Sequence, residues 1–380
     1  MAQLVFELQQ HTPILHFQHG QPGATLRATE VKPKLDRFML GIHAQKHTQL
    51  NPEWLIGPDK KSLDYRMRIS LRNDGRKEYW VCSQATTKQK LDPIALIKKS
   101  PYFAQMETDK ILQKRFDQKI WNTIDKKGLF WLNTVKVTLF SLHPSLLEEV
   151  KKLIQDFFIC ANFGTRNDKG FGSFTVVRIN GEYVSTSVEK ALLNQYDIVY
   201  KRTDPIRNAY DVEGVNLVFK TITDDYNKIR SFMETYVRNG RFGENLEWDR
   251  TFIKRKVKKE EPHEEDYIYV RGLLGLPSSY SYEELPGKPE VKISDKDEEV
   301  ERFPSPLFFK VIKGSIFIAG HASATECMLD KRIRIECNAS RKPSYLSTPE
   351  TFNLKNYLSE AIRTKKLKYQ LVKSSYFVNR

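Results

Sequence analysis

The sequence contains little cysteine, and its cysteines are widely spaced. Cys82, Cys160, Cys327 and Cys337 stand far apart in a chain of 380 residues, and no two of them form a CxxC pair. This spacing argues against a zinc site and against a disulfide framework. We therefore expect buried free thiols in a reducing compartment.

Long hydrophobic runs are also missing. No stretch approaches the roughly 18 consecutive apolar residues that a membrane-spanning helix requires. The opening residues MAQLVFELQQ have neither the basic region nor the cleavage site of a signal peptide, and they are typical of a first strand. These absences predict a cytoplasmic protein without a membrane partner.

The sequence lacks the motifs of common catalytic and cofactor sites. It holds no P-loop, no HExxH motif, no nucleophile elbow and no kinase motifs. His43 and His47 stand four residues apart, as two metal ligands on a helix would, but the polar run around them does not favour a helix. We predict no metal, no cofactor and no catalytic residue. One alternative stays open, in which His16 or His19 supports metal-independent RNA cleavage by general acid-base chemistry.

Positive charge is what the sequence has in excess. It contains 62 Lys and Arg against 47 Asp and Glu, a formal net charge of +15. Such an excess favours a polyanion as partner, because neutralised phosphates release condensed counterions. Anionic membranes attract the same charge, and a basic interaction protein unrelated to RNA is a further alternative.

The clearest structural unit lies in the middle of the chain. Residues 135–142 alternate as a strand, and residues 145–163 carry apolar side chains at helical spacing. A glycine-rich loop over 164–172 leads to a second strand over 173–179. This order makes half of a ferredoxin-like βαββαβ sandwich. It fits a doubly wound sheet less well, because few βα units repeat along the chain.

Further elements extend this prediction in both directions. Before the central unit we expect a strand over 3–8, a helix from Val31 or Lys32 with Pro33 in its first turn, a hairpin of 65–71 and 78–82, and a largely helical 91–127. After it we expect a strand over 214–222, a helix over 224–240 capped by Asp224 and stopped by Gly240, a strand pair within 305–320 around Lys313 and Gly314, and a helix near 349–363.

The predicted fold class is α+β, with two tandem ferredoxin-like, RRM-like domains that carry helical and loop insertions. The first domain covers residues 1–180 and the second covers 181–380. The charged stretches 254–266 and 283–302 are predicted to be solvated insertions of the second domain.

The glycine-rich loop is the main candidate site. Gly164, Gly170 and Gly172 let the backbone approach a ligand closely, and exposed N–H groups can cradle phosphate oxygens. Arg166 and Lys169 add charge. Phe171 has two possible roles, to stack on a base or to anchor the loop. The alternative for the whole loop is a helix C-cap followed by a tight turn.

A second candidate is the basic segment that opens the first predicted helix. Arg27, Lys32, Lys34 and Arg37 place four cations on a short stretch, a spacing that can follow a phosphate backbone. The alternative is an ordinary solvated helix face.

Four stretches together resemble the RAMP superfamily of CRISPR-associated proteins, and within it the first-numbered (head) subunit of the type III-B Cmr complex. They are TPILHFQ with GATLRATEVKPKLDRF, GTRNDKGFGSF, RGLLGLP and RFPSPLFFKVI, in this order between residues 12 and 312. The resemblance implies two RRM-like domains in an RNA-binding subunit that makes no chemistry of its own. Matching positions imply RNA contacts at Arg27, Lys32, Lys34, Gly164, Arg166, Lys169, Gly170, Phe171 and Gly172.

The resemblance also implies partners. They are guide RNA, near its 3′ end, or the target RNA paired with it, and other RAMP subunits of an antiviral ribonucleoprotein. A metal-independent CRISPR repeat-processing endoribonuclease of the same superfamily is the alternative function. The glycine-rich loop of such an enzyme would usually lie near the C-terminus, whereas this one lies in the middle of the chain.

Overall fold

The computed structural model is a mixed α+β structure with several antiparallel sheets, as the sequence predicts. It divides into two compact units: the first holds residues 1–223, 309–318 and 370–380, and the second holds 224–308 and 319–369. None of the helices described has the length and hydropathy of a membrane-spanning segment. The residues described are 1–15, 26–71, 77–81, 95–97, 128–131, 134–207, 209–210, 212–275, 279–281, 290–295, 303, 305–338 and 342–373.

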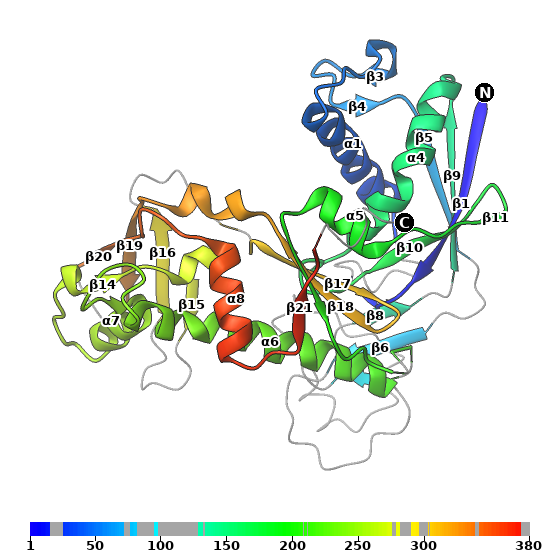
Figure 1. The fold of residues 1–380 in the computed structure, drawn as a ribbon. Helices are drawn as coiled ribbons and strands as arrows, with labels where there is room; N and C mark the ends of the chain where they lie inside the picture. The colour runs from blue at the N-terminus through cyan, green and yellow to red at the C-terminus, as the bar shows by residue number, and fades with distance from the viewer. Residues whose placement is uncertain are drawn as a thin grey trace. The chain divides into compact units, whose positions relative to one another are not determined.

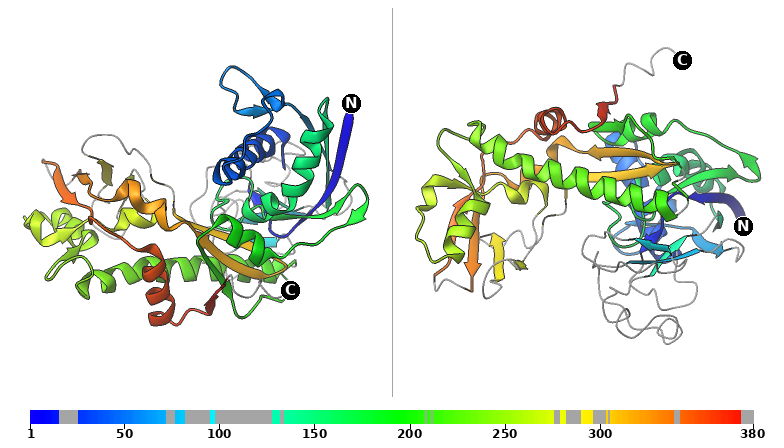
Figure 2. Two further views of the ribbon diagram at one scale, coloured as in Figure 1. Left: turned by 45° about the horizontal axis from the view of Figure 1, so that its top comes forward. Right: turned by 90° about the horizontal axis from the view of Figure 1, so that it is seen from below.

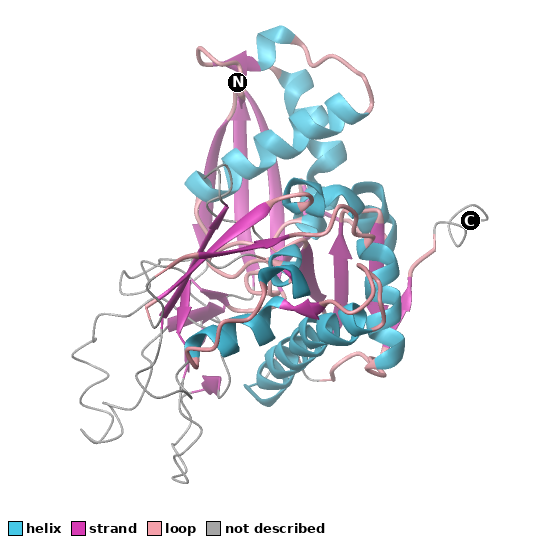
Figure 3. Cartoon of the chain, turned by 90° about the vertical axis from the view of Figure 1, so that its left-hand side faces the viewer, coloured by secondary structure: helices cyan, strands magenta, loops and turns pink. Residues whose placement is uncertain are grey.

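The first unit is built on a five-stranded sheet of order β11-β10-β1-β9-β5, in which all four pairings are antiparallel. Helices α1 (Ala28–Gln45) and α4 (Pro144–Cys160) pack on one face of it (Figures 1 and 3). The strands are β1 (Ala2–Gln10), β5 (Arg66–Leu71), β9 (Thr134–Ser141), β10 (Phe174–Ile179) and β11 (Glu182–Tyr183).

The core of this sheet follows from two periodicities. Leu4, Phe6 and Leu8 alternate along β1 and are buried under the helices, whereas the residues between them face the other side. On α4, buried residues recur at intervals of three or four, as at Val150 and Ile154. The predicted strand, helix and strand of the central unit are therefore confirmed as β9, α4 and β10.

Helix α1 begins earlier than the sequence predicts. It starts at Ala28, so Pro33 lies inside the helix and not in its first turn. A proline there removes one backbone hydrogen bond and costs about 3 kcal/mol. Burial of Val31, Leu35 and Met39 against the core offsets this cost.

A second, four-stranded sheet has the order β17-β18-β12-β21. Lys313 and Gly314 join β17 and β18, which confirms the predicted strand pair. Between β12 and β17 the chain forms α6, and between β18 and β21 it forms α8 (Leu354–Thr364), the predicted C-terminal helix. The strands are β12 (Ile198–Arg202), β17 (Leu307–Ile312), β18 (Ser315–Gly320) and β21 (Tyr369–Leu371).

The predicted strand over 214–222 is wrong, because these residues form the first half of α6 (Val212–Arg238), which Figure 2 shows as one unbroken helix. Their β-branched composition favours a strand. However, the buried residues Val215, Val218 and Ile222 follow helical spacing, and this periodicity decides the structure. Asp224 therefore lies inside the helix and does not cap it.

The second unit contains a six-stranded sheet of order β13-β14-β20-β19-β16-β15 and the helix α7 (Asp249–Val257). The first predicted solvated stretch, 254–266, contains the end of α7, and none of its residues is buried. The prediction for the second stretch, 283–302, is partly wrong, because it contains β16, where Val291 and Ile293 alternate into the core. The strands are β13 (Glu247–Trp248), β14 (Tyr267–Ile268), β15 (Ser279–Ser281), β16 (Glu290–Asp295), β19 (Arg332–Cys337) and β20 (Ser344–Ser347).

The predicted hairpin of 65–71 and 78–82 is also wrong, because its two strands belong to different sheets. β5 pairs with β9, whereas β6 (Lys77–Val81) pairs with β7 (Ala95–Ile97) and β8 (Gly128–Trp131). β8 also pairs with β2 (Ile14–Leu15). Of the predicted helical stretch 91–127, only β7 lies inside the described residues.

The smaller elements complete the described structure. Cys160 and Cys337 are free and buried as expected, but Cys327 is free and exposed, and Cys82 lies outside the described residues. The short elements are η1 (Pro52–Trp54), β3 (Leu55–Ile56), β4 (Ser62–Leu63), α5 (Val188–Gln195), η2 (Glu264–Asp266), η3 (Arg271–Leu274) and η4 (Ala322–Met328).

We expect Pro33→Ala to stabilise the protein. Alanine restores a backbone hydrogen bond inside α1, and Pro33 is exposed, so no packing is lost. The midpoint of urea unfolding should rise by an amount equivalent to about 1–3 kcal/mol. Thr29→Ala, also at an exposed position of α1, is the control and should change the midpoint little. An unchanged or lower midpoint for Pro33→Ala would contradict the helical assignment of this residue.

Candidate nucleic-acid interface

The backbone of the glycine-rich loop is largely engaged by protein groups. The N–H of Gly164 donates to Glu30 Oε1 at 2.7 Å, and the N–H of Gly172 donates to the Pro13 carbonyl at 2.8 Å. These donors are the groups that the sequence suggests for a phosphate cradle. In this conformation they tie the loop to α1 and to the segment before β2.

Packing explains why the loop needs glycine at its two ends. Gly164 and Gly172 have φ values of 84° and 64°, in the left-handed region. A Cβ at Gly164 would lie 2.5 Å from the Leu15 carbonyl oxygen, and one at Gly172 would lie 1.9 Å from that of Phe163. Close backbone approach within the protein is therefore sufficient reason for both glycines.

Phe171 takes the anchoring role of the two that the sequence allows. Its side chain is 1% exposed and stacks on Phe219 of α6, with ring centroids 3.8 Å apart and an interplanar angle of 12°. No face of this ring is open to a base. Gly170 beside it is buried as well, against Ile222 and Val311.

The two cations of the loop differ in their surroundings. Lys169 Nζ lies 3.0 Å from Asp168 Oδ2, and its side chain is 12% exposed. Arg166 is half-buried and has a left-handed φ of 53°. The acidic neighbour offsets much of the positive charge of Lys169.

Lys34 on α1 lies next to the start of the loop. Its Nζ donates to Glu30 Oε1 at 3.1 Å and to the Asn162 carbonyl at 3.0 Å. The structure therefore brings Lys34 and Gly164 together through the shared carboxylate of Glu30.

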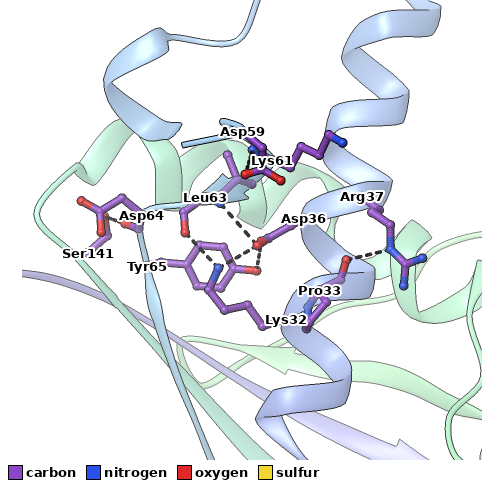
Figure 4. Close-up of polar contacts among 10 residues, drawn as sticks. All are labelled: Lys32, Pro33, Asp36, Arg37, Asp59, Lys61, Leu63, Asp64, Tyr65 and Ser141. Carbon is purple, nitrogen blue, oxygen red and sulfur yellow. Dashed lines mark hydrogen bonds and ion pairs between the residues drawn. The ribbon is translucent and has the colours of Figure 1, made fainter. Parts of the chain in front are cut away.

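Lys32 belongs to a separate buried cluster, shown in Figure 4. Asp36 is its centre: the carboxylate accepts from Lys32 Nζ at 2.7 Å and from the Tyr65 hydroxyl at 2.7 Å. Burial, together with the negative charge of Asp36, raises the pKa of Tyr65. Lys32 also donates to the Leu63 carbonyl, so it holds the β4–β5 segment against α1.

Arg27 and Arg37 occupy the remaining positions of the basic segment. Arg27 is the residue before α1 and is half-buried. Arg37 is exposed, and its Nε donates to the Pro33 carbonyl at 3.2 Å, which leaves the end of the guanidinium directed away from the Asp36 cluster (Figure 4).

A buried lysine, Lys310 on β17, organises the start of the loop. Its Nζ donates to the carbonyls of Phe158, Ala161 and Phe174 at 2.6, 2.8 and 3.2 Å, and to Asn162 Oδ1 at 3.1 Å. Phe158 and Ala161 lie at the C-terminal end of α4, where the helix dipole favours a cation. Burial nevertheless lowers the pKa of Lys310 to about 7.

The side chain of Asn162 connects Lys310 to the glycine-rich loop. Its Nδ2 donates to the Asn167 carbonyl at 2.7 Å and to the Phe309 carbonyl at 2.8 Å. The amide therefore joins the end of α4, the middle of the loop and β17 in one network with Lys310.

The side chain of His11 is held between Tyr210 and β10. His11 is buried, with Nε2 2.7 Å from Thr175 Oγ1 and Nδ1 3.1 Å from the Tyr210 hydroxyl. Burial, with smaller effects of Lys310 and Lys313, lowers its pKa to about 3. His16 and His19 lie outside the described residues. His43 lies in α1, contrary to the sequence prediction, and His47 lies just after it.

The sequence reasoning missed a cationic surface on the sheet face opposite α1 and α4. We call it the outer face. Arg66 and Arg68 of β5 and Lys136 of β9 are exposed there, and the register pairs Arg66 with Phe140 and Arg68 with Thr138. The alternation in YRMRISL and VKVTLFS is the signal that could have found it. The outer face consists of Arg66, Arg68, Lys136, Phe140, Arg178 and Tyr183.

The far edge of the outer face carries an exposed aromatic ring. Tyr183 is 78% exposed, and the Arg178 guanidinium lies 4.1 Å from its ring centroid. The one acidic neighbour in register with Arg178 and Lys136 is Glu7, which lies 3.9 Å from Arg178. Cations therefore outnumber acids on the outer face.

We predict that Lys310→Met destabilises the protein by about 2–4 kcal/mol, because several buried oxygen acceptors lose their donor. Chemical unfolding at neutral pH measures this change. Lys313→Met, at the exposed turn of the same hairpin, is the matched control and should stay within about 0.5 kcal/mol of wild type. Equal stability of the two variants would show that Lys310 does not hold the network.

Two family models match the chain, and together they cover residues 1–377. The family model described as the Cmr1 N-terminal domain matches residues 1–233, and the Cmr1 C-terminal domain matches residues 228–377. No curated protein matches the sequence.

Two solved structures are similar to the chain. The crystal structure of Cmr1 from Pyrococcus furiosus in its apo form has 13% identity and a TM-score of 0.42, with 98% of this chain and 99% of that chain covered. A type III-B Cmr-beta complex bound to cognate target RNA and AMPPnP, in the presence of ssDNA, contains a chain with 13% identity and a TM-score of 0.40, covering 96% and 98%.

The two family models together cover nearly all of the sequence, and they confirm the resemblance seen in its motifs. The chain belongs to the Cmr1 family.

Proposed function

We propose that this chain is a non-catalytic RNA-binding subunit of a type III-B CRISPR effector complex, acting in antiviral defence. Membership of the Cmr1 family supports the place in a Cmr complex. Its RNA partners would be the guide RNA, near the 3′ end, or the target RNA paired with it, and its protein partners other RAMP subunits. We further propose a cytoplasmic location and no membrane partner.

The outer face is the observation that carries this proposal. Arg66, Arg68 and Lys136 are exposed on neighbouring strands and can neutralise successive phosphates. Phe140 and Tyr183 can stack on bases, which is how open sheets commonly hold single-stranded RNA. Because stacking depends little on base identity, this surface suits a strand whose sequence varies.

The candidates found from sequence can add to this surface. Arg27, Arg37 and Arg166 have at least part of their side chains at the surface and are proposed as further phosphate contacts. Lys32 and Lys34 make hydrogen bonds that stabilise the fold, so any RNA contact by them would be additional to that role.

The sheet orders support the proposal of two tandem ferredoxin-like domains, with the boundary between residues 180 and 181. In the first domain the elements run β1-α1-β5-β9-α4-β10, and the four strands lie in the spatial order β10-β1-β9-β5. In the second they run β12-α6-β17-β18-α8-β21, with the order β21-β12-β18-β17. Each is a βαββαβ sequence with strands in the order 4-1-3-2.

We propose binding without cleavage. The buried imidazole of His11, with its pKa near 3, supports this choice, because it cannot take up a proton near neutral pH. The endoribonuclease alternative depends on His16 or His19.

We predict that Arg66→Ala with Arg68→Ala weakens binding of single-stranded repeat RNA by about tenfold or more. The slope of log affinity against log salt should fall by about 1.4, because two phosphate contacts are lost. Fluorescence anisotropy at several salt concentrations, in EDTA, measures both quantities, and the RNA should be recovered intact.

The matched control is Lys60→Ala with Lys61→Ala, which removes the same charge from the exposed β3–β4 turn. If both double variants bind RNA with the same affinity and the same salt dependence, the outer face is not the binding surface. Specific cleavage in EDTA would favour the endoribonuclease.

A further inference from the structure

The second unit contains a pocket of about 320 Å³ lined by three arginines. Arg230 comes from the second half of α6, Arg250 from the first turn of α7, and Arg271 from the start of η3. Among the described residues that line the pocket, none is acidic. Its volume lies within the range of small-molecule sites.

Arg230 and Arg250 differ from other arginines of the same unit. Arg238 and Arg241 lie 2.7 and 2.8 Å from the carboxylates of Glu234 and Glu360. In contrast, no ion pair joins Arg230 or Arg250 to an acid within the described part of the chain. Their charges are therefore available to an anion.

Three hydrogen bonds fix the walls that carry these arginines. Asp249 is fully buried, and its Oδ1 accepts from the N–H groups of Val270 at 3.0 Å and Arg271 at 3.1 Å. These two bonds hold the start of α7 beside η3. The Tyr226 hydroxyl donates to the Leu274 carbonyl at 3.0 Å and ties α6 to the other end of η3.

Aromatic rings lie beside two of the guanidinium groups. The Arg250 guanidinium lies 5.9 Å from the Trp248 ring and that of Arg230 lies 5.7 Å from the Tyr226 ring. Such contacts reduce the freedom of the side chains before a ligand arrives.

The rest of the lining suits an organic ligand more than a bare anion. Met233, Trp248 and Leu274 supply buried apolar surface, while Asn227 and Ser231 are exposed and can exchange hydrogen bonds. Guanidinium groups bind phosphate through paired N–H donors, and an apolar wall suits the face of a base.

We propose that this pocket binds one nucleotide, with its phosphate held by Arg230, Arg250 and Arg271 and its nucleoside against the apolar wall. The nucleotide is either free or a unit of an RNA strand; the recognition chemistry is the same. The site is distinct from the outer face, so it stands whether or not that face binds RNA.

Isothermal titration of the full-length protein with adenosine 5′-monophosphate, inorganic phosphate, adenosine and a short RNA tests this proposal. We expect the nucleotide to bind about tenfold or more tightly than phosphate or adenosine. Arg230→Gln with Arg250→Gln should weaken nucleotide binding by about tenfold or more. The matched control is Arg238→Gln with Arg255→Gln, which removes two carboxylate-paired charges from the same unit and should leave binding unchanged.

Each outcome has a defined meaning. If the short RNA binds and the free nucleotide does not, and this binding depends on Arg230 and Arg250, the ligand is a unit of an RNA strand. If both bind, the pocket is a general nucleotide site. Phosphate binding as tight as nucleotide binding would overturn the proposal, since the pocket would then be an anion site. No binding of any probe, or equal loss in the pocket and control variants, would overturn it as well. Nucleotide binding in Arg66→Ala with Arg68→Ala should match wild type, which separates this site from the outer face.

Discussion

The first unit depends on one buried charge. Lys310 brings an ammonium group into the core, where its hydrogen bonds to the end of α4 and to Asn162 make burial tolerable. Asn162 in turn fixes the glycine-rich loop to β17. The glycine-rich loop therefore has a structural role. Its conformation depends on Lys310, which lies nearly 150 positions later in the chain than Asn162.

Because the glycine-rich loop is held by these contacts, the sheet is the better candidate for the RNA-binding surface. Loop N–H groups that bind Glu30 and Pro13 are not available to a phosphate, and Phe171 is stacked on Phe219. On the outer face the cations outnumber the one acid in register with them, Glu7, and helices α1 and α4 pack on the opposite side of the sheet. A nucleic-acid strand could contact the cations of the outer face without any rearrangement of the core.

Periodicity made much of the fold predictable, and long-range contacts made the rest unpredictable. The central strand, helix and strand followed from local spacing, and motif order identified the family. The β-branched residues before residue 223 led to the prediction of a strand where the structure has a helix, because composition was given more weight than periodicity. Lys310 gave only the weak signal of a lysine within an apolar strand. The arginine pocket had no signal, since its walls come from three segments that only folding brings together.

The central claim is that RNA lies on the outer face of the first sheet. Photocrosslinking of the full-length protein to RNA containing 4-thiouridine, followed by mass spectrometry of the crosslinked peptides, tests it directly. The account predicts crosslinks in the peptides that contain Phe140 and Tyr183, the two rings that are proposed to stack on bases. Crosslinks confined to residues 164–172, with none on the sheet, would contradict it.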